Sequence, residues 1–134
     1  MTALCFDHVA LSVDGRSLFA PLTAQVAPGD TLCLTGPSGC GKSSLLNFAC
    51  GFLPDGMEAR GRVRFGEDDL TQTPPVARRL GLLFQDALLF AHLSVADNVA
   101  FGLKAGGGRA ERRARVDDAL ARVGLTGFGS RDPA

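Results

Sequence analysis

The stretch Gly36-Pro37-Ser38-Gly39-Cys40-Gly41-Lys42-Ser43 decides the fold of this chain. It matches the phosphate-loop pattern G-x-x-x-x-G-K-[ST] at every fixed position. The apolar run at residues 31–35 predicts a short buried strand before the loop, and residues 44–50 predict a helix that ends at Gly51. A strand, a glycine-rich loop and a helix in this order indicate a site that binds phosphate groups.

The residue types in the loop suit the chemistry of phosphate binding. Glycines allow successive backbone N–H groups to turn toward phosphate oxygens, and the helix that follows adds the positive end of its dipole. Lys42 can place its ammonium between the β- and γ-phosphates, and the Ser43 hydroxyl can bind Mg²⁺. The predicted nucleotide-binding residues are Gly36, Pro37, Ser38, Gly39, Cys40, Gly41, Lys42, Ser43 and Ser44.

Composition narrows the class of protein. With 134 residues, of which 46% are hydrophobic and 21% charged, the chain has the size and composition of one globular domain. Its 14 basic and 14 acidic residues balance, so charge gives no basis for a nucleic-acid partner. We expect no amino-terminal signal and no membrane span, because polar residues interrupt both of the longer apolar runs. The four cysteines form no C-x-x-C pair, so we expect no zinc site.

Three regions are predicted along the chain. Alternating apolar residues and a turn signal at Asp14-Gly15 predict an antiparallel β-subdomain over residues 1–30. Residues 31–86 are predicted to form the core, from the phosphate loop to a second buried strand at residues 80–84 and the polar pair Gln85-Asp86. Polar residues at the carboxyl end of a parallel strand are typical ligand contacts in α/β sheets.

The remaining residues, 87–134, predict helices. Ser94 and Asp97 form a variant capping box that opens a helix running toward Lys104. Residues 109–123 predict a second helix, with an exposed pair of Glu111 and Arg115. Its predicted apolar stripe consists of Val116, Ala119, Leu120 and Val123.

Two further segments make a family recognisable when they are combined with the loop. They are Phe84-Gln85-Asp86 and the run from Leu89 to Leu103, which reads L-F-A-H-L-S-V-A-D-N-V-A-F-G-L. Along its whole length the chain resembles the amino-terminal half of the ATP-binding subunit of bacterial ABC transporters, of the importer type. The resemblance implies an α/β P-loop NTPase fold of the ABC ATPase kind, with an amino-terminal antiparallel β-subdomain and part of a helical subdomain.

The resemblance also implies ligands, roles and partners. ATP and Mg²⁺ are the expected ligands, Lys42 and Gln85 the expected catalytic residues, and Ser43 and Gln85 the expected Mg²⁺ ligands. The segment Asp86–Gly102 resembles the surface that receives the coupling helix of the membrane-spanning subunits. The family further implies a dimer of ATP-binding subunits and a cytoplasmic location, peripheral to the inner face of the plasma membrane. Import rather than export rests on the resemblance alone.

The sequence departs from the family pattern in two places. Val13 lies near the place where the family stacks adenine on an aromatic residue, and Phe19 is a weak substitute. The chain also contains no L-S-G-G-Q signature, Walker B strand, catalytic glutamate or switch histidine. We therefore expect a fragment or a truncated gene, with an incomplete core sheet and little or no steady-state hydrolysis. Because the strands at residues 31–35 and 80–84 would lack ladder partners, we expect low stability or aggregation.

Two alternatives to a transporter subunit come from other classes. The first is another P-loop enzyme. A GTPase would need an N-K-x-D tetrapeptide, which surrounds neither Lys42 nor Lys104, and a small kinase would use lid arginines such as Arg78 and Arg79. The second alternative is a truncated chain that binds nucleotide or a partner without turnover.

Overall fold

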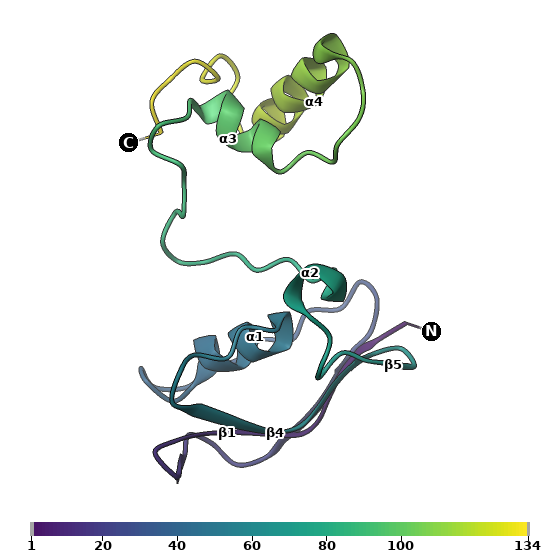
Figure 1. Cartoon of the computed structure of the whole chain (residues 1–134), viewed down its shortest axis with the longest axis vertical. Helices are drawn as coiled ribbons and strands as arrows, with labels where there is room; N and C mark the ends of the chain where they lie inside the picture. The colour runs from purple at the N-terminus through teal and green to yellow at the C-terminus, as the bar shows by residue number, and fades with distance from the viewer. Residues whose placement is uncertain (1, 134) are drawn as a thin grey trace. The chain divides into compact units, whose positions relative to one another are not determined.

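The computed structural model describes residues 2–133. The chain forms two compact units, one that ends at Leu83 and one that begins at Phe84 (Figure 1). The first unit contains a sheet, the phosphate loop and the helix that follows the loop. The second unit is helical. Each unit is described below by itself.

The sheet of the first unit is antiparallel throughout the described residues. Its strands are β1 (Leu4–Val13), β2 (Arg16–Ser17), β3 (Leu22–Val26), β4 (Met57–Phe65) and β5 (Asp68–Asp69). Strand β1 is central, because it pairs with β2, β3 and β4. The turn at Asp14 and Gly15 joins β1 to β2, with both residues at positive φ, which confirms the predicted hairpin.

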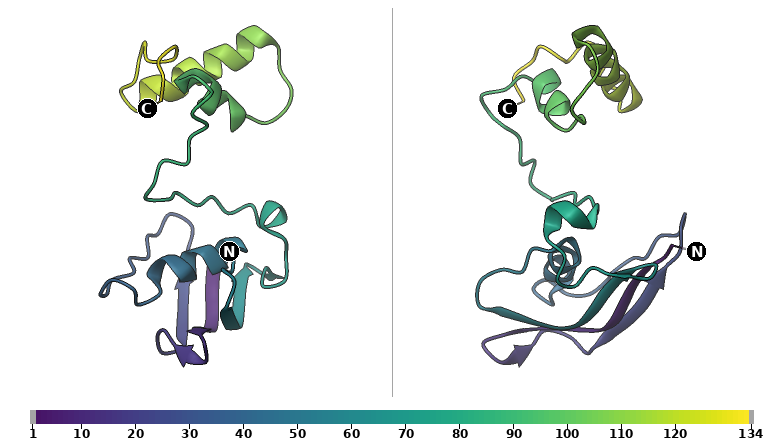
Figure 2. Two further views of the ribbon diagram at one scale, coloured as in Figure 1. Left: turned by 60° about the vertical axis from the view of Figure 1, so that its left-hand side comes forward. Right: turned by 45° about the vertical axis from the view of Figure 1, so that its right-hand side comes forward.

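Helix α1 (Lys42–Cys50) covers one face of this sheet (Figure 2). Its buried side chains Leu45, Phe48 and Ala49 join a single core cluster with four residues of β1 and β4. Those sheet residues are Phe6, Val9, Leu11 and Val63. The helix ends at Gly51, whose φ is 92°, as the sequence predicts. The core therefore sits directly beneath the helix that carries the end of the phosphate loop.

The two predicted parallel strands are not formed, and this part of the sequence interpretation is wrong. Residues 31–35 and 80–84 run without strand pairing, and Leu83 is 96% exposed. A strand requires a partner for its backbone N–H and C=O groups, and no described residue supplies one to either segment. The expectation of an incomplete core sheet is confirmed.

Of the three described helices that follow the sheet in sequence, α3 (Val95–Phe101) begins with the predicted side-chain cap, and α2 (Pro75–Arg78) was not predicted. Helix α2 lies in the first unit; α3 and α4 (Arg109–Arg122) lie in the second. The Ser94 side chain accepts a hydrogen bond from the backbone N–H of Asp97, which confirms the predicted start of α3. Val116 and Leu120 are buried, whereas Val123 is 69% exposed because α4 ends before it; the predicted apolar stripe is wrong at that position. None of the helices in residues 2–133 combines the length and apolar character needed to cross a bilayer.

We expect the 134-residue chain to self-associate through the exposed apolar residues that precede and follow Gln85. Leu83 and Leu88 present large apolar side chains to solvent on unpaired backbone, a combination that favours aggregation. Changing both residues to lysine should lower the apparent mass measured by size-exclusion chromatography with light scattering. Val76→Lys is the matched control, since Val76 is as exposed as Leu83 but lies on α2. A monomeric wild-type chain with a cooperative thermal transition would contradict this expectation.

Candidate nucleotide-binding site

The amino end of α1 presents free backbone donors at the phosphate loop. Helix α1 begins at Lys42, and its N-cap is Gly41, at a φ of 91° and a ψ of 10°. No side chain caps the first turn of this helix. The first N–H groups of a helix have no partner within the helix, so at this end they are available to an anion.

Lys42 is held across the loop. Its ammonium Nζ donates to the backbone oxygen of Gly36 at 2.9 Å and to that of Pro37 at 2.7 Å. The third N–H can reach only the Cys40 thiol, at 3.7 Å between Nζ and Sγ. A thiol sulfur is a weak acceptor, and a phosphate oxygen forms a much stronger charge-assisted bond. The two bonds to carbonyl oxygens thus hold the ammonium in place, and its third N–H is left for an anionic ligand.

The hydroxyl of Ser43 is available at the same end of α1. Ser43 is exposed and Ser44 half-buried, and within residues 2–133 neither side chain forms a hydrogen bond. The Ser43 oxygen is of the hard type that Mg²⁺ prefers. The structure therefore brings together Lys42, Ser43 and the loop residues Gly36 to Gly41.

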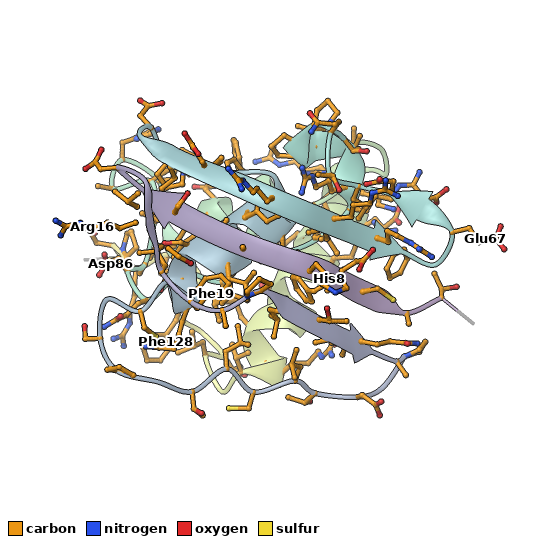
Figure 3. The ribbon with its side chains drawn as sticks, turned by 90° about the horizontal axis from the view of Figure 1, so that it is seen from below. His8, Arg16, Phe19, Glu67, Asp86 and Phe128 are labelled. Carbon is orange, nitrogen blue, oxygen red and sulfur yellow. The ribbon has the colours of Figure 1, made fainter. Side chains whose placement is uncertain are left out.

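Gly41 of the loop packs closely against Leu18 and Phe19, the two residues that follow β2. A Cβ at Gly41 would lie 3.0 Å from a ring carbon of Phe19 and 3.1 Å from a methyl group of Leu18. Phe19, which follows β2, is half-buried and packs against the core (Figure 3). An aromatic ring therefore lies beside the loop, whereas Val13, at the end of β1, pairs with Arg16.

Gln85 and Asp86 belong to the second unit and are exposed (Asp86 is labelled in Figure 3). The Mg²⁺ ligand pair expected from the family, Ser43 and Gln85, therefore has one member in each unit. Gln85 has no hydrogen-bond partner within residues 2–133, and its carboxamide is free to bind a ligand.

The structure also shows two polar residues to which the sequence interpretation gave no structural role. Arg78 is 6% exposed and donates only to backbone oxygens, so it cannot act as the lid arginine of a kinase. Burial lowers the pKa of its guanidinium, although the nearby Cys50 and Asp69 raise it.

The second residue is Asn98, whose carboxamide donates to the backbone oxygens of Phe90, Leu93 and Ser94 and accepts from the Phe90 N–H.

Asn98 thereby shapes the exposed loop before α3. Its bonds to both backbone groups of Phe90 place that ring 4.6 Å from the ring of Phe101, measured between centroids. Both rings remain substantially exposed. Asparagine is a weak helix former whose side chain favours hydrogen bonds to nearby backbone groups. An asparagine inside a predicted helix is therefore the sequence signal that could have pointed to this role of Asn98.

An uncapped helix start, a lysine anchored by two loop carbonyls and a serine hydroxyl without a hydrogen bond in residues 2–133 lie together at the phosphate loop. The model of the ABC transporter family matches residues 19–133, and the chain belongs to this family. The chain is 42% identical to the spermidine/putrescine import ATP-binding protein PotA of Marinobacter nauticus, over 98% of this chain and 35% of that protein. It is 39% identical to the uncharacterized ABC transporter ATP-binding protein YnjD of Escherichia coli, of which it covers 60%.

The fold agrees with that of a solved family structure. A bacterial Atm1-family ABC exporter with ATP bound matches over 98% of this chain and 22% of its own, with a TM-score of 0.76 and 29% sequence identity. The predicted fold class is confirmed. The chain spans about a third of the length of several curated relatives that it matches.

Gly41→Ala should destabilise the chain more than Gly39→Ala. Both glycines have left-handed backbone, which costs alanine about 1–2 kcal/mol. Only at Gly41 does the new methyl also meet Phe19 and Leu18, and such overpacking costs about 1–3 kcal/mol more. Urea unfolding of both variants measures the difference, and Phe19→Leu should recover part of the Gly41→Ala loss. Equal losses would show that the Phe19 contact does not constrain the loop.

Proposed function

We propose that this chain binds ATP with Mg²⁺ through the loop and the first turn of α1. The binding residues are Gly36, Pro37, Ser38, Gly39, Cys40, Gly41, Lys42, Ser43 and Ser44. The single observation that carries this proposal is the Lys42 ammonium, which is fixed by two loop carbonyls and retains one N–H for a phosphate oxygen. The positive end of α1 acts in the same direction as this charge.

Mg²⁺ would be held by Ser43 and Gln85, which offer a hydroxyl and a carboxamide oxygen. Bound there, the ion would neutralise negative charge on the β- and γ-phosphates. Lys42 and Gln85 are the proposed catalytic residues of the complete ATPase. Gln85 lies in the second unit, whereas Lys42 and Ser43 lie in the first.

We assign the chain to the ATP-binding, energy-coupling subunits of import-type ABC transporters. Relatives named as import ATP-binding proteins for spermidine/putrescine, 2-aminoethylphosphonate, Fe(3+) ions and sulfate/thiosulfate support this assignment. The segment Asp86–Gly102 would contact the membrane-spanning subunits. Its exposed rings are of the type that binds an apolar helix face: Phe90, which is hydrogen-bonded to Asn98, and Phe101, which lies against Phe90. The complete subunit would act as a dimer at the cytoplasmic face of the membrane.

Nucleotide binding without turnover is the second candidate. No apolar run in these 134 residues ends in the Asp-Glu pair of a catalytic strand, a pair whose glutamate would activate the attacking water. Phosphate release from an ATP·Mg²⁺ solution separates the two candidates, since steady release by this chain would exclude the second.

Lys42→Ala should weaken the binding of ATP·Mg²⁺ by about tenfold to a hundredfold, because a charge-assisted hydrogen bond contributes about 1.5–3 kcal/mol. Isothermal titration calorimetry measures the affinity. Lys104→Ala is the matched control, since Lys104 is the other lysine of the chain and is exposed in the second unit. Equal affinities for the two variants would contradict the proposed site.

A further inference from the structure

Arg78 is a buried cation that is bound entirely by backbone carbonyl groups. Its Nη1 donates to Phe48 and Ala49 at 2.8 Å each, Nη2 donates to Thr71 at 2.8 Å, and Nε donates to Thr73 at 2.7 Å. No carboxylate in residues 2–133 forms a salt bridge with it. A buried charge is costly unless it is hydrogen-bonded, and each of the three guanidinium nitrogens donates to at least one carbonyl oxygen here.

The carbonyl groups that Arg78 binds lie on two separate segments. Phe48 and Ala49 are in the last turn of α1, where a positive charge is favourable, and the Phe48 oxygen also accepts the backbone N–H of Gly51 at 3.0 Å. Thr71 and Thr73 are in the loop between β5 and α2. The guanidinium therefore ties the carboxyl end of α1 to the chain that leads on toward Gln85.

The Arg78 side chain packs closely against Gly51, the residue that ends α1. A Cβ at Gly51 would lie 2.8 Å from the Arg78 Nε and 3.0 Å from the Pro75 Cγ. The glycine that ends α1 is thus needed both for its positive φ and for the space that Arg78 fills. The next residue, Arg79, caps α2 with a φ of 57° and is exposed.

We propose that Arg78 is a positioning residue for the phosphate loop. Helix α1 is a short rigid element with Lys42 and Ser43 at one end and the Arg78 contacts at the other. The core side chains fix the helix against the sheet, and Arg78 fixes its position along its own axis. Losing that contact lets the helix shift and fray, which misplaces the first-turn N–H groups. The nucleotide part of this inference rests on the proposed function; the part that concerns α1 does not.

Amide hydrogen exchange of the full chain tests the inference without nucleotide. In Arg78→Met, the exchange of Leu45 and Leu46 in the first half of α1 should accelerate by about tenfold, while amides of β1 and β4 keep their rates. Arg79→Met is the matched control and should change neither set. A change confined to the last turn of α1 would mean a merely local structural role, and an equal change in the sheet would mean global destabilisation; either result would overturn the proposal.

Nucleotide affinity supplies the second measurement. At a temperature where circular dichroism shows the variants folded, Arg78→Met should weaken the binding of ATP·Mg²⁺ by about tenfold, and Arg79→Met should leave it unchanged. If Arg78→Met does not fold, Arg78→Lys replaces it in both measurements, because an ammonium with three donors cannot serve both carbonyl pairs. A wild-type chain that binds no ATP·Mg²⁺ would refute the proposed function, while the exchange result would still decide the role of Arg78. If the wild-type chain binds ATP·Mg²⁺ and the Arg78 variant binds it equally well, the positioning role of Arg78 is refuted.

Discussion

The packing of α1 on the antiparallel sheet is the contact on which the rest of the first unit depends. Leu45, Phe48 and Ala49 meet a surface that contains Val9 and Val63, both of them fully buried. Burial of a large apolar side chain contributes about 1.5–3 kcal/mol, so these few residues supply much of the stability of the unit. Because the amino end of α1 carries the phosphate loop, the same contact that forms the core also directs the helix dipole.

Local sequence signals predicted several features whose stabilising partners lie close by in the chain, although the short helix α2 was not among them. The Asp14-Gly15 turn, the Ser94 cap, the Gly51 stop and the Glu111–Arg115 pair all form as expected. Each depends on residues within a few positions of one another, where propensity and capping chemistry decide the outcome. The phosphate loop is a further case, because Gly36, Gly39 and Gly41, the glycines that its spacing supplies, all take positive φ values.

Features that depend on distant residues were predicted poorly. Residues 31–35 and 80–84 have the composition of buried strands, but composition cannot supply the ladder partners that would make them strands. The position of Arg78 was equally hidden, since its acceptors on α1 lie about thirty residues earlier in the chain. Packing of Phe19 against Gly41 is a third example, and only the folded backbone reveals it.

The central claim is that the main-chain N–H groups of the loop and of the first turn of α1 hold the phosphates of ATP. Backbone ¹H–¹⁵N NMR of the chain during titration with ATP·Mg²⁺ tests that claim most directly. The account predicts saturable shifts concentrated on the amides of Gly39 to Ser44, with little change in β4. Shifts that do not saturate, or that fall on the arginine-lined pocket of about 560 Å³ beside Arg109 and Arg113 instead, would contradict it.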